Sequence, residues 1–121
     1  MDRSDTILDT NTIDAIRTMG TPSDADDFTR ELFQAFIDQS EIVIRDLLVA
    51  VVKKRPDQVK SLAHRLRGSS ANVGASALSI QAERIESTVG GDVSDTRIKM
   101  AVLELQSIFR KTVRELEAFT S

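Results

Sequence analysis

Residues 98–119 read IKMAVLELQSIFRKTVRELEAF and contain the most regular helical pattern in the chain. Apolar side chains, together with one threonine, return to the same side of a helix every three or four residues. They are Ile98, Val102, Leu105, Phe109, Thr112, Leu116 and Phe119. The pattern predicts a long amphipathic helix over residues 94–119, with Asp92 or Ser94 as its N-terminal cap.

Three further long helices are predicted upstream, over residues 23–53, 56–72 and 75–89, and a short one over residues 11–19. Glycine or proline marks each break between them, as is typical of helix ends and helix starts. These breaks contain Gly20, Pro22, Pro56, Gly74, Gly90 and Gly91. The alternation typical of strands is found nowhere. We therefore predict an all-α fold, an antiparallel up-down four-helix bundle whose short additional N-terminal helix covers one end.

The helix predicted over residues 23–53 carries two apolar stripes. The first consists of Phe28, Leu32, Phe36, Val43, Leu47 and Val51, and it predicts the side that faces the core. The second consists of Phe33, Ile37, Ile44 and Leu48. Two alternatives exist for the second stripe: it widens the core face, which is common in bundles, or it forms an exposed strip that binds a partner.

Composition excludes several classes of function. The chain has no cysteine and one histidine, so no metal site and no cofactor are expected. A net charge of −3 without tryptophan or tyrosine argues against binding to nucleic acid. No apolar run approaches the roughly 20 residues that span a membrane, and no signal peptide is recognisable. We expect residues 1–121 to form one cytoplasmic domain, and a monomer, because four helices can close a core on their own.

His64 is the only histidine, and its place on the helix predicts that it is exposed. At 100° per residue, the apolar residues of 56–72 gather around Val59, whereas His64 lies about 140° away. Its neighbours at one-turn and two-turn spacing are Lys60, Arg67, Gly68 and Ala71. Two cations beside an imidazole would offset the charge of a phosphoryl group placed on it. A glycine inside a helix costs about 1 kcal/mol relative to alanine, so Gly68 serves some other need.

Geometry alone leaves a second interpretation of this face. Exposed histidines, lysines and arginines are common on solvated helices, and Gly68 could simply allow another helix to pack closely. A catalytic site of the chain's own finds little support, because no P-loop or EF-hand pattern is present. A dyad of His64 with Ser69 or Ser70 would lack an accompanying oxyanion-hole motif.

The run from His64 to Ala75 resembles the signature of histidine-containing phosphotransfer (Hpt) domains of two-component phosphorelays. That signature has His, any residue, Leu, Lys and Gly, then small residues, then an apolar residue followed by Gly and another small residue. The chain supplies His64, Leu66, Gly68, Ser69, Ser70, Ala71, Val73, Gly74 and Ala75 in register. The resemblance implies that His64 is the phosphoacceptor and that Gly68 leaves space beside it. Arg67 stands where the family usually has lysine, so the charge is kept but the geometry of the contact differs.

Glu86 follows His64 by 22 positions and lies on the next predicted helix, in an Ile-Glu pair similar to that of the family. In some Hpt domains a Glu or Gln here hydrogen-bonds the imidazole. A carboxylate that accepts Nδ1–H would leave the Nε2 lone pair free to attack phosphorus. The alternative is that Glu86 is a solvated surface acid.

The resemblance implies a phosphocarrier rather than a kinase. Its partners would be response-regulator receiver domains, one giving and one taking the phosphoryl group, together with a hybrid sensor kinase. The alternative function is a phosphate-independent adaptor that binds receiver domains through the same bundle face. The presence of His64 favours the phosphocarrier, since an adaptor has no need of a nucleophile.

Overall fold

The computed structural model describes residues 6–19, 25–89 and 96–120, and these residues form five α-helices and no strand. The helices are α1 (Thr10–Arg17), α2 (Ala25–Val52), α3 (Pro56–Asn72), α4 (Ser76–Thr88) and α5 (Thr96–Thr120). Pro56 stands in the first turn of α3, where its missing N–H leaves no hydrogen bond unmade. Several predicted caps and breaks lie outside the described residues: Gly20, Pro22, Gly90, Gly91, Asp92 and Ser94.

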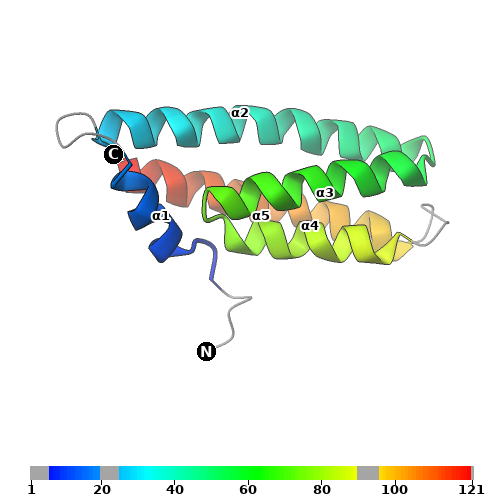
Figure 1. The fold of residues 1–121 in the computed structure, drawn as a ribbon. Helices are drawn as coiled ribbons and strands as arrows, with labels where there is room; N and C mark the ends of the chain where they lie inside the picture. Colours follow the sequence, from blue (N-terminus) through cyan, green and yellow to red (C-terminus); the bar gives the residue numbers. More distant parts are fainter. Residues whose placement is uncertain (1–5, 20–24, 90–95, 121) are drawn as a thin grey trace.

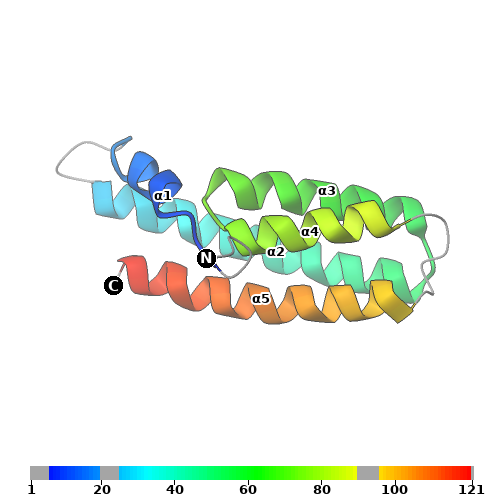
Figure 2. The ribbon, with the colours of Figure 1, turned by 90° about the horizontal axis from the view of Figure 1, so that it is seen from below.

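The four long helices pack side by side in a bundle (Figure 1). Each packs against the next one along the chain, and α5 closes the ring by packing on α2. The predicted all-α bundle is therefore confirmed. Figures 1 and 2 show α1 at the end of the bundle where α2 begins and α5 ends. There α1 packs on α2, and the Arg17 guanidinium lies 5.5 Å from the ring centre of Phe119 in α5.

The core follows the predicted stripes with two corrections. Phe33, Ile37 and Ile44 are buried, and Leu48 packs partly buried against them, so the exposed partner strip is wrong. The physical reason is that α2 packs on both α3 and α5, which requires a wide apolar face. Phe28 was expected in the core but is 38% exposed. It lies in the first turn of α2, about 100° around the axis from Leu47.

A tight corner joins α3 to α4, as the sequence predicts. Gly74 adopts φ +82°, a left-handed conformation that favours glycine. Its carbonyl accepts a hydrogen bond of 2.7 Å from the Asp9 N–H, and the Ile7 carbonyl accepts one of 3.3 Å from the Ala77 N–H. We call residues 7–9 the N-terminal strap. The strap holds the corner, and Asp9 also caps α1, since its side chain accepts from Asn11 N–H.

Candidate functional site

The outward face of α3 carries His64. Val59, Ala63 and Leu66 fix the opposite face of α3, because all three are completely buried in the bundle. The His64 side chain is 60% exposed, as its angular position predicts. A helix anchored through its apolar face thus holds the imidazole at the surface without burying it.

Glu86 of α4 lies against the imidazole. Its Oε2 is 2.7 Å from His64 Nδ1, and its side chain is only 17% exposed. The alternative of a solvated surface acid is therefore wrong, because the carboxylate sits in the angle between α3 and α4. A carboxylate is purely an acceptor, so a hydrogen bond here requires the proton on Nδ1.

Arg67 stands one turn after His64 and approaches the same two groups. Its Nη2 lies 3.2 Å from His64 Nδ1, and its Nη1 lies 3.4 Å from Glu86 Oε1. The Arg67 side chain is 38% exposed, so it is neither buried nor freely solvated. His64, Arg67 and Glu86 form a cluster that we call the histidine triad.

The other predicted site residues lie around the triad. Lys60 is exposed one turn before His64, and Ala71 is exposed at the other end of the same face. Ala71 also lines a small pocket shared with residues of the N-terminal strap and the start of α1. A Cβ built on Gly68 meets no atom within 4 Å in the described part of the chain. Gly68 therefore does not serve helix packing, and the space beside His64 is open.

The two serines of the motif do not form a catalytic dyad with His64. Ser69 donates its hydroxyl to the Leu66 carbonyl, 3.2 Å away, and Ser70 is completely buried on the core side of α3. Among the described residues no group of three or more His, Cys, Asp or Glu is arranged to hold a metal ion. No helix in that part of the chain is long and apolar enough to cross a membrane.

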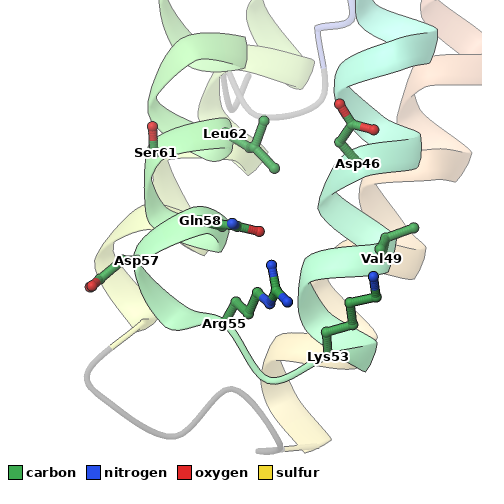
Figure 3. A pocket seen from close by; sticks show the side chains of 8 residues that line it. All are labelled: Asp46, Val49, Lys53, Arg55, Asp57, Gln58, Ser61 and Leu62. Atoms are coloured by element: carbon green, nitrogen blue, oxygen red, sulfur yellow. The ribbon is translucent and has the colours of Figure 1, made fainter.

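A groove lies between the end of α2 and the start of α3, where Figure 3 shows its lining side chains. Arg55 and Gln58 point into the gap, Lys53 runs along α2 toward Val49, and Asp57 and Ser61 point away from the gap (Figure 3). His64 is not among the lining residues. The groove is therefore separate from the histidine triad.

The arrangement suits nucleophilic chemistry at one ring nitrogen. Both polar contacts that His64 makes with other described residues go to Nδ1. With the proton on Nδ1, the Nε2 lone pair is available, and the ring is exposed enough for a second protein to reach it. An exposed ring nitrogen held on a packed helix can be reached by another protein, so the arrangement suits transfer between proteins.

Besides the contact between Arg67 and Glu86, sequence reasoning did not predict a hydrogen bond from α4 that supports the site. The Ser79 hydroxyl of α4 donates a hydrogen bond of 3.0 Å to the Arg67 carbonyl and ties α4 to the helix that carries the triad. The sequence shows only that Ser79 is a small polar residue on α4, and it could not show which backbone carbonyl the Ser79 hydroxyl would meet.

Comparison with known proteins gives one family and several related folds. The model of the Hpt domain family matches residues 31–118. Histidine-containing phosphotransfer protein B from Pseudomonas aeruginosa PAO1 has a similar structure, with 18% identity, a TM-score of 0.81 and coverage of 94% of each chain. A rice protein proposed to be a histidine-containing phosphotransfer protein has 21% identity and a TM-score of 0.76, over 98% of this chain and 88% of the rice chain. No curated protein sequence matches the chain.

Proposed function

Since this chain belongs to the Hpt domain family, whose function is histidine phosphotransfer in a phosphorelay, we propose that His64 is the residue that accepts and passes on the phosphoryl group. One observation carries this assignment. The only histidine of the chain is exposed on the bundle surface, with its Nδ1 2.7 Å from the Glu86 carboxylate and its Nε2 left available.

This geometry supports the following transfer step. The Nε2 lone pair attacks the phosphorus of an aspartyl phosphate on a receiver domain. The P–O bond to the aspartate breaks, and its electron pair stays on the aspartate carboxylate. The imidazole ring then carries positive charge, which Glu86 offsets through Nδ1–H without any proton leaving. In the reverse direction the N–P bond breaks, and neutral imidazole with its proton on Nδ1 is the leaving group.

Positive charge around His64 assists the approach of the phosphoryl group. Arg67 and Lys60 lie one turn to either side of the imidazole, and both are cations at neutral pH. Gly68 and Ala71 have little or no side chain, so they leave space on this face of α3. A receiver domain can therefore bring its phosphoryl group within bonding distance of His64. Phosphoryl transfer depends chiefly on positioning and charge neutralisation, so this face needs no metal of its own, and the receiver domain supplies the metal ion.

The domain acts as a phosphocarrier without kinase activity of its own. We infer that residues 1–121 work as one monomeric, cytoplasmic Hpt domain, with two receiver domains and a hybrid sensor kinase as partners. The phosphate-independent adaptor is not favoured, because a binding surface alone does not call for an oriented imidazole.

Transfer of labelled phosphate tests the assignment of His64. Purified protein is mixed with a panel of phosphorylated receiver domains, and His64→Gln at equal helicity is the matched control. We expect acid-labile, base-stable label on the native chain and none on His64→Gln. Equal labelling of both proteins, or label on neither, would reject His64 as the acceptor. Receiver binding without transfer would support the adaptor.

The orienting role of Glu86 has a separate test. We expect Glu86→Ala to keep the fold and to slow transfer about tenfold, which is about 1.4 kcal/mol in the barrier. Single-turnover transfer from one receiver domain measures the rate, and Glu83→Ala, an exposed acid on the same helix, is the control. An unchanged rate in Glu86→Ala would remove Glu86 from the mechanism.

A further inference from the structure

Two residues compete for one nitrogen in the histidine triad. Glu86 Oε2 lies 2.7 Å from His64 Nδ1, and Arg67 Nη2 lies 3.2 Å from the same atom. A carboxylate can only accept a hydrogen bond, and a guanidinium can only donate one. The first contact therefore needs a proton on Nδ1, whereas the second needs a lone pair there. Neutral His64 cannot satisfy both partners at once.

The distances show which partner prevails. A separation of 2.7 Å is typical of a charge-assisted hydrogen bond to a carboxylate, whereas 3.2 Å is at the long end of the usual range. Nδ1 thus carries the proton, and Nδ1–H donates a hydrogen bond to the Glu86 carboxylate. Arg67 Nη2 then faces another donor, so the guanidinium gains nothing from Nδ1 and must satisfy its N–H groups elsewhere.

The partner that Arg67 needs is beside it. Glu86 Oε1 is buried and has no hydrogen-bond partner among the residues that the structure describes, and it lies 3.4 Å from Arg67 Nη1. A buried carboxylate oxygen without a donor is unfavourable, and a small movement of the half-exposed guanidinium would supply one. Arginine suits this task better than lysine, because its planar fork can reach the carboxylate while the rest of the group stays near the ring.

We propose that Arg67 is a positioning residue: its guanidinium fixes the Glu86 carboxylate through Oε1, and Glu86 in turn fixes the proton of His64 on Nδ1. The proposal rests on the proposed function only in taking Nε2 as the attacking atom. The proposal explains why arginine stands where the family usually has lysine, because Arg67 contacts a carboxylate as well as assisting the phosphoryl group.

Without Arg67 the carboxylate loses its second anchor and can turn toward water. Nδ1–H then has a weaker acceptor, and the ring redistributes toward the tautomer that holds its proton on Nε2. That tautomer has no lone pair at Nε2, so the proton must move before the N–P bond can form. Loss of Arg67 should therefore act on the free protein, before any receiver domain is present.

The ring nitrogens of His64 report the tautomer directly. Because it is the only histidine, long-range proton–nitrogen NMR spectra of the ¹⁵N-labelled protein contain a single imidazole. The spectra are recorded without a receiver domain, at a pH where the ring is neutral. We expect the native protein to hold its proton mainly on Nδ1. We expect Arg67→Gln to shift the tautomer ratio at least threefold toward Nε2–H, and Arg67→Lys to restore part of the difference.

Arg65→Gln is the matched control, since Arg65 is an exposed arginine on the same helix whose contact is to Gln39 of α2. Its tautomer ratio should equal that of the native protein. A role of Arg67 in phosphate binding alone would lower the transfer rate and leave the ratio unchanged, and that result would overturn the proposal. If Arg67→Gln were to lose helicity, Arg67→Lys against the native protein would decide by the same criterion.

The outcome also separates this proposal from the proposed function. A ratio that depends on Arg67, in a protein that accepts no label from any receiver domain, would reject the phosphocarrier and support the role of Arg67. Transfer of label to His64, with a tautomer ratio that does not depend on Arg67, would support the phosphocarrier and reject the role of Arg67.

Discussion

Gly68 and Gly74 stand six residues apart in the same motif, yet their surroundings are opposite. A Cβ on Gly68 would meet nothing within 4 Å. A Cβ on Gly74 would lie 3.0 Å from the Asp9 carbonyl oxygen and 3.2 Å from Thr12 Cβ, at a positive φ. The bundle needs Gly74 to make its corner, whereas none of the residues that the structure describes crowds the position of Gly68. The outer face of α3 beside Gly68 has room for the receiver domain that the proposed function requires, and substitutions at the two regions should separate stability from transfer.

The largest effect on stability is expected at the corner. Gly74→Val places a β-branched side chain at positive φ and against the N-terminal strap, so we expect the free energy of unfolding to fall by about 3 kcal/mol. Urea denaturation followed by circular dichroism measures it. Gly74→Ala should lose less, and a variant as stable as the native protein would show that the corner can rearrange.

The largest effect on transfer without loss of stability is expected at Gly68. Gly68→Gln fills the open space beside His64, and we expect phosphotransfer to slow at least tenfold, about 1.4 kcal/mol in the barrier. Gly68→Ala should stabilise the helix by about 1 kcal/mol and slow transfer less. Transfer as fast in Gly68→Gln as in the native protein would mean that the receiver domain approaches from another side.

A smaller effect is expected at Ala71, at the far end of the same face. Ala71→Gln is expected to weaken receiver binding about threefold, about 0.6 kcal/mol, because the added side chain stands at the edge of the contact. Titration calorimetry with one receiver domain measures this, and Ala118→Gln on α5 is the matched control. Equal losses in both variants would point to a general effect of the added side chain.

The smallest effect is expected at Lys60. Lys60→Gln removes one exposed charge near His64, and exposed charges mainly affect the rate of encounter. We expect transfer to slow about twofold at low salt, with the difference fading as ionic strength rises. Lys111→Gln on α5 controls for net charge. A difference that persists in high salt would indicate direct contact between Lys60 and the phosphoryl group.

The helices and the exposure of His64 could be predicted from the sequence because both depend on local periodicity. Breaks at glycine and proline mark the helix ends, and a rotation of 100° per residue places His64 opposite Val59. The two stripes of α2 were ambiguous, because a stripe shows which residues share a face but not how many neighbours cover it. The prediction that Phe28 is buried was wrong for a related reason, since burial at a helix end depends on what packs against that end.

The contact between Glu86 and His64 was expected from the resemblance to Hpt domains, but periodicity and spacing alone could not predict it or the contacts of Arg67, because they depend on how two helices sit against each other. Glu86 is 22 positions from His64, and only the packing of α4 on α3 turns it toward the ring. The same holds for the N-terminal strap, whose hydrogen bonds to Gly74 and Ala77 join segments more than 60 positions apart. Composition gives no sign of such pairings.

The 60% exposure of the His64 side chain also bears on how long a phosphoryl group could remain on it. Under the proposed function, a phosphoryl group on His64 would be open to bulk water as well as to the next receiver domain. The described bundle would not enclose it, so hydrolysis of the N–P bond, rather than release from a pocket, would limit the lifetime of the phosphorylated state. A relay built on this domain must find its acceptor within that lifetime, and the abundance of the acceptor decides how much of each signal is passed on.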